Sequence, residues 1–451
     1  MNRITVVSQT VRTMKYTVAI LMMLVSCLLV VWAGAASAQE QRPQPLSLTE
    51  CILVALQNNP EIVSSQQGII GARAGLTRAR SSYYPQLSLS ASEGMTSGGI
   101  AAPGGSDWRN ELGLGVNMTL WRSGRSANVA ESRSELEVTE LSHLNTMQAL
   151  AERVATDYYA VLASQELVAV AEAGVEAAEQ HLQDVKTRIR LGAAAEVDIF
   201  AVEDDLARAQ LDLIDARSGV RSALARLKFT MGVAYTTDLQ ITPAPMRVAE
   251  SLPSLSEAVN SAMDKRPDVL ASRGTIQARQ YAFEQAATRR GPTLELGGQY
   301  GQSYSDWAAN DDSWNVLATV SWSLFDGQAT KADETSARAG VRRSRAALQL
   351  LLNQVALEVE NTLVEIDRTT ERIKASEKSV AAARARLRAA EARYRQGVGI
   401  LLEVTDARAA LTSAAASQVR VRFDYQVALV ALQRATGMLS LPGSALGDSN
   451  D

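Results

Sequence analysis

Two long stretches of the chain carry a large, mostly apolar residue at every seventh position. Residues spaced in this way form the line of contact, or seam, between the helices of a coiled coil. The first comprises Met147, Val154, Val161, Val168, Val175, Leu182 and Ile189, and the second comprises Leu352, Val359, Ile366, Ile373, Val380, Leu387 and Tyr394. In the second stretch the other seam position carries mostly small residues, namely Val355, Thr362, Thr369, Ser376, Ala383 and Ala390, and neither stretch contains proline. This pattern predicts two coiled-coil helices of about 65 residues, each about 100 Å long. The shorter segments that follow are predicted to return as helices, because apolar residues from Ile199 to Leu227 also repeat every seven positions.

Four other segments alternate between apolar and polar residues, as strands with two different faces do. They are centred on 87–91, 112–120, 293–297 and 314–324. We expect strands of about ten residues, the length that a tilted strand needs to cross a bilayer. Trp121, Trp314 and Trp322 would then form aromatic girdles at the two interfaces. The alternative is a soluble sheet of two hairpins with one buried face.

Two polar segments, Gly94–Asp107 and Ser303–Asp312, separate the members of each strand pair. Both contain glycine or aspartate, the residues that favour turns and loops. We therefore expect them to be the loops that join the two hairpins.

The sequence predicts the same order of elements twice: a helix, a pair of strands, a long helix and a return helix. Ser47-Leu48-Thr49-Glu50 reappears as Ser254-Leu255-Ser256-Glu257, 207 positions later, and both are capping boxes that open a helix. Prolines and glycines repeat at nearly the same offset: Pro60 with Pro267, Pro85 with Pro292, Gly192 with Gly397, and Gly232 with Gly437. We infer a duplication, with repeats at 39–232 and 254–437, a linker at 233–253 and a disordered tail at 438–451.

The N-terminus reads as a targeting segment. Basic residues precede an apolar run from Tyr16 to Trp32, and Ala36-Ser37-Ala38 forms a cleavage site, which predicts a signal peptide over 1–38. In the alternative interpretation, Leu24–Cys27 is a lipoprotein box and Cys27 is lipidated. No later stretch reaches the roughly 18 apolar residues of a membrane-spanning helix, so we expect any crossing to use strands.

Composition argues against several functional classes. Charged residues are 21% of the chain and the net charge is only −4, which is unlike a nucleic-acid-binding protein. Two cysteines and two histidines are too few for a Cys/His zinc site, and we interpret His143 and His181 as surface residues. The chain lacks the phosphate-binding and nucleophile-elbow motifs. We predict no enzymatic activity, cofactor, metal or nucleic-acid partner.

A membrane location would require several copies of the chain. One chain offers four strands, whereas the smallest membrane barrels have about eight. Open sheet edges cannot lie in lipid, so strands must pair between chains. A dimer would supply eight strands and a trimer twelve, and the pattern alone leaves both open.

Several short motifs recur in one order along the chain. They are Leu48-Thr49-Glu50, Asn58-Asn59-Pro60-Glu61, Tyr84-Pro85-Gln86-Leu87, Leu324-Phe325-Asp326-Gly327, and the segments from Arg190 to Asp198 and from Tyr394 to Asp406. In this order and spacing the chain resembles the TolC family of outer-membrane efflux proteins of Gram-negative bacteria, over nearly all of residues 46–437.

The resemblance implies a mainly α fold with membrane β-strands. It implies a homotrimer with a 12-stranded β-barrel in outer-membrane lipid and an α-helical barrel in the periplasm. Such proteins are passive exit ducts of tripartite efflux pumps or type I secretion systems. They work with a periplasmic adaptor (membrane fusion) protein and an inner-membrane transporter.

The ends of the helical hairpins are the predicted functional site. Gly192 and Gly397 have the pattern of left-handed helix caps. By the resemblance, these two glycines, with Arg190 and Arg395, contact the adaptor.

The resemblance also places Glu403 and Asp406 at the closed periplasmic entrance. Three copies around one axis would form an acidic ring that favours cations. The alternative is a pair of solvated acids near a helix start. Tyr394 and Asp198 form a second candidate pair, in which the hydroxyl bonds the carboxylate and holds the entrance shut. Otherwise Tyr394 is a seam residue whose hydroxyl meets water.

A second functional class stays in view. A periplasmic coiled-coil adaptor or scaffold without a pore would explain the heptads. It would not explain four amphipathic strands with tryptophan at their ends, nor two helical hairpins in tandem. We therefore favour the duct, and dependence of the folded protein on detergent separates the two classes.

Overall fold

A computed structural model describes residues 45–97, 106–243, 245–246, 251–305 and 308–442. The predicted signal peptide over 1–38, Cys27 and the last nine residues of the predicted tail lie outside this described part. Clustering of the fold gives a small unit and a main unit. In the small unit, whose described residues are 45–46 and 238–240, the Leu46 amide donates to the Gln240 carbonyl at 2.8 Å. The main unit comprises Ser47–Thr237 and Ile241–Asp451 and is described below.

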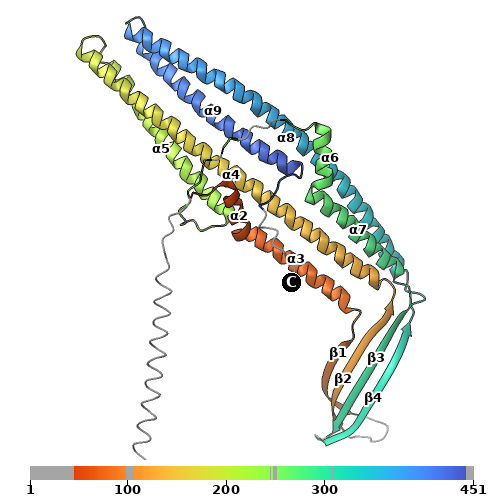
Figure 1. Cartoon of the computed structure of the whole chain (residues 1–451). Coiled ribbons are helices and arrows are strands. Elements are labelled where there is room, and N and C mark those ends of the chain that lie inside the picture. Colours follow the sequence, from red (N-terminus) through yellow and green to blue (C-terminus); the bar gives the residue numbers. More distant parts are fainter. Residues whose placement is uncertain (1–44, 98–105, 244, 247–250, 306–307, 443–451) are drawn as a thin grey trace, which may run out of the picture. The chain divides into compact units, whose positions relative to one another are not determined.

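The main unit contains the predicted element order twice (Figure 1). The first set is α2 (Leu48–Asn58), α3 (Pro60–Ser81), β1 (Gln86–Ser97), β2 (Ser106–Arg122), α4 (Arg125–Arg190) and α5 (Asp198–Met231). The second set is α6 (Leu255–Lys265), α7 (Pro267–Thr288), β3 (Thr293–Ser305), β4 (Ala308–Ser321), α8 (Ala329–Arg395) and α9 (Leu401–Ala435). The long helices α4 and α8 have 66 and 67 residues, which confirms the length that the heptads predict.

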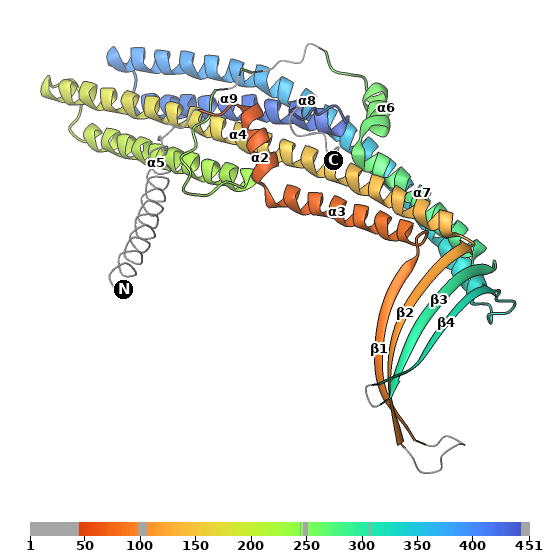
Figure 2. The ribbon, with the colours of Figure 1, turned by 60° about the horizontal axis from the view of Figure 1, so that its bottom comes forward.

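Each long helix pairs with the helix that follows it, α4 with α5 and α8 with α9 (Figure 2). Helix α4 also packs against α3, α7 and α9, so the two hairpins are joined within one chain. The seam residues form the core of these pairs: Val154 and Val161 on α4, and Val359 and Ile366 on α8, are fully buried. Large apolar residues at one heptad position therefore hold the helices together over most of their length.

The four strands form one antiparallel sheet in the order β1-β2-β3-β4. The strands have 12, 17, 13 and 14 residues, so the expected length of about ten was too short. Of the expected loop Gly94–Asp107, residues 98–105 lie outside the described part, and the strands on either side reach Ser97 and Ser106, which pair with each other. Of the expected loop Ser303–Asp312, residues 306–307 lie outside the described part and the rest is strand, paired as far as Ser305 opposite Ala308. The hydrogen bonds between strands join backbone groups. A strand can therefore continue through polar residues, beyond the segment in which apolar and polar side chains alternate.

The short helices are tied to the return helices by one device that occurs twice. At the junction of α2 and α3, the Asn59 side-chain amide donates to the Thr230 carbonyl at the end of α5 (2.8 Å). At the junction of α6 and α7, the Arg266 guanidinium donates to the Ala435 carbonyl at the end of α9 (3.3 Å). Carbonyls in the last turn of a helix have no intrahelical partner, so each contact satisfies a free acceptor.

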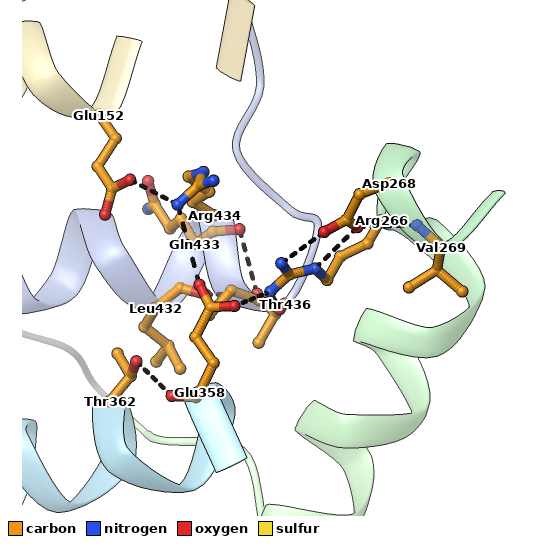
Figure 3. A network of polar contacts seen from close by, with 11 residues as sticks. Glu152, Arg266, Asp268, Val269, Glu358, Thr362, Leu432, Gln433, Arg434 and Thr436 are labelled. Carbon is orange, nitrogen blue, oxygen red and sulfur yellow. Dashed lines mark hydrogen bonds and ion pairs between the residues drawn. The ribbon is translucent and has the colours of Figure 1, made fainter. Parts of the chain in front are cut away.

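In the second repeat this contact is the centre of a larger polar network (Figure 3). Arg266 is 5% exposed and bonds both oxygens of Asp268, at 3.1 and 2.8 Å, and Glu358 of α8 at 2.8 Å. Burial raises the pKa of the Asp268 carboxyl, but the bonds from Arg266 outweigh it and hold that pKa below its usual range. Arg434 of α9 pairs with Glu152 of α4 at 3.0 Å and approaches Glu358 at 3.9 Å. The network therefore joins both hairpins and the α6–α7 junction.

A glycine at each return-helix end makes this close approach possible. Gly232 has φ +70°, and a Cβ there would lie 2.8 Å from the backbone of Asn58 and Asn59. Gly437, at the end of α9, has φ +71°, and a Cβ there would lie 3.0 Å from the Arg266 backbone nitrogen. By contrast Gly192, at the end of the long helix α4, has φ +70°, but a Cβ there would meet nothing within 4 Å.

We expect Gly232→Ala to lower the free energy of unfolding more than Gly192→Ala. Both substitutions carry the left-handed backbone cost of about 1–2 kcal/mol, and only the first adds a backbone collision. Thermal or denaturant unfolding of the two variants measures the difference. Equal losses would contradict the close packing of α5 on the α2–α3 junction.

Candidate functional site

Both hairpins turn through the same backbone motif. Gly192 and Gly397 have φ +70° and +77°, as predicted for left-handed caps. The residue directly after each glycine donates its backbone amide to a carbonyl in the last turn of the long helix. Ala193 donates to the Arg188 carbonyl (2.8 Å), and Val398 donates to the Arg393 carbonyl (3.1 Å). These bonds satisfy carbonyls at the helix ends and fix the direction of the return.

An apolar cluster joins the two hairpins close to these turns. Leu182 and Val185 of α4, Val202 of α5 and Leu401 of α9 are buried together, and Tyr394 of α8 packs against them. Both long helices and both return helices thus contribute to one small core. The polar side chains around that core are consequently held at set distances from each other.

Arg188 is the polar link between the hairpin ends. Its guanidinium donates to the Tyr394 carbonyl at 3.2 Å and to the Arg395 carbonyl at 3.5 Å, both in the last turn of α8. The guanidinium carbon also lies 5.0 Å from the centre of the Tyr394 ring. A cation at a helix C-terminus is favourable, and a cation over an aromatic face adds to it.

The expected bond between Tyr394 and Asp198 is not formed in the described structure. The Tyr394 hydroxyl is buried without a hydrogen-bond partner among the described residues. Burial and then the nearby Asp198 carboxylate raise the pKa of Tyr394, so the two groups are neighbours but not bonded. The ring is instead held by Arg188 and by the apolar cluster, because a seam residue points its side chain into the core.

The interpretation of both histidines as surface residues was wrong. His181 is 6% exposed and its ring stands edge-on to Tyr394, with 6.1 Å between ring centres. Burial, and then the charge of Arg408, lower the pKa of His181 to about 4. His143 is half-buried and its ring nitrogen Nδ1 lies 2.7 Å from the Ser65 hydroxyl. His181 directly precedes the seam residue Leu182, where helix packing covers it.

The two acids expected at the entrance differ in their surroundings. Glu403 forms an ion pair of 2.7 Å with Arg393, which neutralises its charge within the chain. Asp406 is exposed, and none of the described residues forms an ion pair with it. One turn of α9 therefore carries one compensated and one free carboxylate.

Arg408 is a further charged residue that the sequence did not single out. Only 11% of its side chain is exposed, and it lies between Asp205 of α5 at 3.9 Å and Glu391 of α8 at 3.6 Å. Arg188, His181 and Arg408 share one signal, because each is adjacent in sequence to a buried or seam position. Such flanking positions commonly carry the polar contacts between paired helices.

The extreme ends of the hairpins are exposed and largely apolar. Leu191 and Val398 are 77% and 73% exposed, and Phe200 is 68% exposed. Arg190 and Arg395, the two arginines predicted to contact an adaptor, are also exposed beside them. This surface combines uncovered apolar groups with positive charge, as protein-binding surfaces often do.

The three predicted girdle tryptophans are all exposed on or beside the sheet. Trp121 lies at the end of β2, Trp314 lies in β4 opposite Tyr300, and Trp322 follows β4 directly. Their exposed fractions are 48%, 78% and 63%. Eight positions separate Trp314 from Trp322, or about 26 Å along a strand. A strand tilted by roughly 40° rises about 20 Å over that separation, somewhat less than the roughly 25 Å height of the apolar band of a membrane barrel.

Two further features are absent from the described residues. None of the described helices combines the length and the apolar character that crossing a membrane requires. No group of three or more His, Cys, Asp or Glu in the described part of the chain could hold a metal ion.

The fold and the sequence place the chain in a known family. A family model described as "Outer membrane efflux protein" matches residues 52–233 and 258–438. The chain belongs to the outer membrane efflux protein family, and it is a protein of the outer membrane. The two matched segments fall on the two sets of elements described above.

Individual relatives agree with this assignment. Protein CyaE of Bordetella pertussis is 26% identical over 317 residues, which are 68% of this chain and 66% of CyaE. Outer membrane protein TolC of Vibrio cholerae is 23% identical over 403 residues, 87% of this chain and 91% of TolC. The solved structure of CusC, a protein studied for transmembrane channel formation, gives a TM-score of 0.77 at 18% identity, covering 86% of this chain and 92% of CusC. The predicted fold class is confirmed.

We expect acidification to destabilise the hairpin ends through His181. The unfolded histidine has a pKa near 6.5, whereas the folded value is about 4. The unfolded chain therefore binds the proton first, and stability is lost as the pH falls from about 6.5 to about 4. The loss is about 3 kcal/mol at about 1.4 kcal/mol per pKa unit.

Amide hydrogen exchange of the hairpin ends at pH 7 and pH 4.5 measures this loss. His181→Gln should lose less protection on acidification than the parent chain does. His143→Gln is the matched control, because that ring is only half-buried and bonded to Ser65. An unchanged loss in His181→Gln would show that another group is responsible.

Proposed function

We propose that this chain forms a homotrimeric outer-membrane duct through which substrates leave in an efflux pump or a type I secretion system. One observation carries the proposal. A four-stranded sheet, in which β1 and β4 each pair on one side only within the described chain, continues directly into two helical hairpins of about 100 Å. A protein of the outer membrane efflux family with such a sheet can complete its backbone pairing in lipid by closing a barrel between chains.

Three chains would supply twelve strands, which is within the range of membrane barrels. The outward faces are apolar: Leu87, Leu89, Val316 and Val320 are all more than 60% exposed in the single chain. The opposite faces are small and polar, with Gly113 facing Ser90 on one side and Gly301 on the other. This division supports a lipid-facing exterior and a water-filled interior.

The helical hairpins would extend into the periplasm and meet the rest of the export system there. A periplasmic adaptor protein would bind the exposed ends around Leu191 and Val398, with Arg190 and Arg395 beside them. An inner-membrane transporter would supply the energy, and this chain would act as a passive conduit without chemistry of its own.

The periplasmic entrance would be lined by acids from three chains. We assign the larger electrostatic role to Asp406, because Arg393 neutralises Glu403 within the chain. Arg188 would hold the two hairpin ends of one chain together and keep the entrance narrow, since it alone bonds the end of α8 from α4 among the described contacts.

The mass of the mature protein in detergent and its conductance in a planar bilayer test the duct directly. A trimer with discrete channels is the expected result. A monomer or dimer that stays folded without detergent and conducts no current would exclude the duct and leave the coiled-coil scaffold.

We expect Asp406→Asn to reduce the cation selectivity of the channel more than Glu403→Gln does. The free carboxylate acts on passing ions at full charge, whereas the paired one is compensated by Arg393. The reversal potential in a salt gradient reports the selectivity of each variant. Equal effects of the two substitutions would contradict the pairing seen in the chain.

We expect Arg188→Met to raise the open fraction of the channel several-fold. The substitution removes two long hydrogen bonds and a cation–ring contact, together worth about 1 kcal/mol. Tyr394→Phe is the control and should leave conductance unchanged, because the hydroxyl that it removes has no partner among the described residues. Single-channel recordings of both variants decide the point. A rise in Tyr394→Phe instead would restore the tyrosine–aspartate latch.

A further inference from the structure

Here a seam is the line along which two different hairpins pack against each other, and not the heptad seam within one hairpin. The described chain has one such seam between its two hairpins, and the duplication implies a second seam of the same kind. In the first seam α9 of the second repeat packs on α4 of the first repeat. An offset of 205 residues relates α4 to α8 and α5 to α9. The matching seam would therefore join α8 of one chain to α5 of another.

Contacts inside the hairpins confirm the offset. Lys186 of α4 pairs with Glu203 of α5 at 3.9 Å, and Glu391 of α8 pairs with Arg408 of α9 at 3.6 Å. Both members of the second pair lie 205 residues after those of the first, with the signs of the charges exchanged. Equivalent positions thus occupy equivalent places on the two hairpins, even where the residues differ.

The faces that would form the second seam are apolar and uncovered. On α8, Leu350, Leu357 and Val364 lie seven positions apart and are 59%, 58% and 59% exposed. On α5, Phe229 is 83% exposed and Ile214 is 59% exposed. A run of large apolar residues at heptad spacing is the pattern of a helix that packs against another helix.

The contacts of the first seam give the register of the second. Arg434 of α9 pairs with Glu152 of α4 at 3.0 Å. Subtracting the offset from Arg434 and adding it to Glu152 leads to Phe229 and Leu357. The first seam thus has the ion pair of Arg434 and Glu152, which belongs to the polar network of Figure 3. At the equivalent positions the second seam would have two exposed apolar side chains, Phe229 and Leu357.

For a second contact of the first seam, shifting the residue numbers by the same offset of 205 leads to residues with the same charges. Arg422 of α9 lies 3.5 Å from Glu166 of α4. The equivalent positions are Arg217 and Glu371, again a cation on the return helix and an anion on the long helix. Both side chains are more than 60% exposed in the single chain. Each already has an ion pair on its own hairpin, Arg217 with Glu172 at 2.9 Å and Glu371 with Lys374 at 2.8 Å, so a contact between copies would extend or replace these pairs.

We propose that α8 of one copy packs on α5 of a second copy in the register of the α4–α9 seam, with Phe229 against Leu357 and Arg217 against Glu371. The seam within the chain is held at this level by the partly buried ion pair of Arg434 and Glu152, and the seam between copies is held by apolar contact. The two seams of the assembled protein differ in kind although the duplication makes them equivalent in position.

The proposal rests on the homotrimer of the proposed function, and a charge exchange tests it. Phe229→Arg and Leu357→Glu should each lower the temperature at which the detergent-solubilised trimer dissociates, because each places a charge in an apolar seam. The double variant recreates the arginine–glutamate pair of the first seam. It should recover most of the stability that the single variants lose.

Phe229→Arg combined with Leu350→Glu is the matched control. Leu350 lies seven residues from Leu357, about 10 Å along the helix, which is too far for the new arginine. This control should stay as unstable as the single variants. Recovery in both double variants, or in neither, would overturn the proposed register.

A crosslink provides a second measurement that does not depend on stability. In a Cys51→Ser background, Phe229→Cys with Leu357→Cys should yield covalent trimers with a short thiol-specific crosslinker, whereas each single substitution should yield monomers. Trimers by mass that conduct current but are not crosslinked would overturn the seam and leave the proposed function intact. Absence of both trimers and current would overturn the two together.

Discussion

The packing of long helices along a heptad seam is the interaction on which the other features depend. Val154 and Val161 on α4 and Val359 and Ile366 on α8 are fully buried, and small residues between the large ones allow close approach. This seam keeps each hairpin straight enough to place its turn about 100 Å from the strands. A separate cluster around Leu182 and Leu401, on the same pairs of helices, sets the positions of the polar groups at the turns.

Those polar groups are held in unusual states by the seam. His181 is buried beside Tyr394 and neutral at pH values well below 6.5, and the Tyr394 hydroxyl has no partner among the described residues. A buried group without a hydrogen bond costs stability unless the surroundings compensate it. Here the contacts of Arg188 with the end of α8 and the apolar cluster provide that compensation.

The duplication explains both the similarity and the difference between the two halves. Asn59 and Arg266 bind equivalent carbonyls at the ends of α5 and α9, so each short-helix pair is anchored in the same way. Only the second anchor extends into a charged network that reaches Glu152 of the first hairpin. The positions equivalent to that ionic link are Phe229 and Leu357, both exposed in one chain. Once two copies of an element occupy different surroundings, their surfaces are free to take on different chemistry.

The local features of this protein could be predicted from its sequence because neighbouring residues determine them. Heptad spacing predicted the two long helices, the glycines at 192 and 397 predicted their left-handed caps, and alternation predicted four strands. Strand length was underestimated, since pairing at Ser97 and Ser305 depends on the partner strand and not on side-chain polarity. Only the tertiary structure decided three features of the hairpin ends. They are the bond of Arg188 to the end of α8, the burial of His181 and the ion pair of Glu403 with Arg393. The first two join residues about 200 positions apart, and the third depends on the geometry of a turn, so no local pattern could specify them.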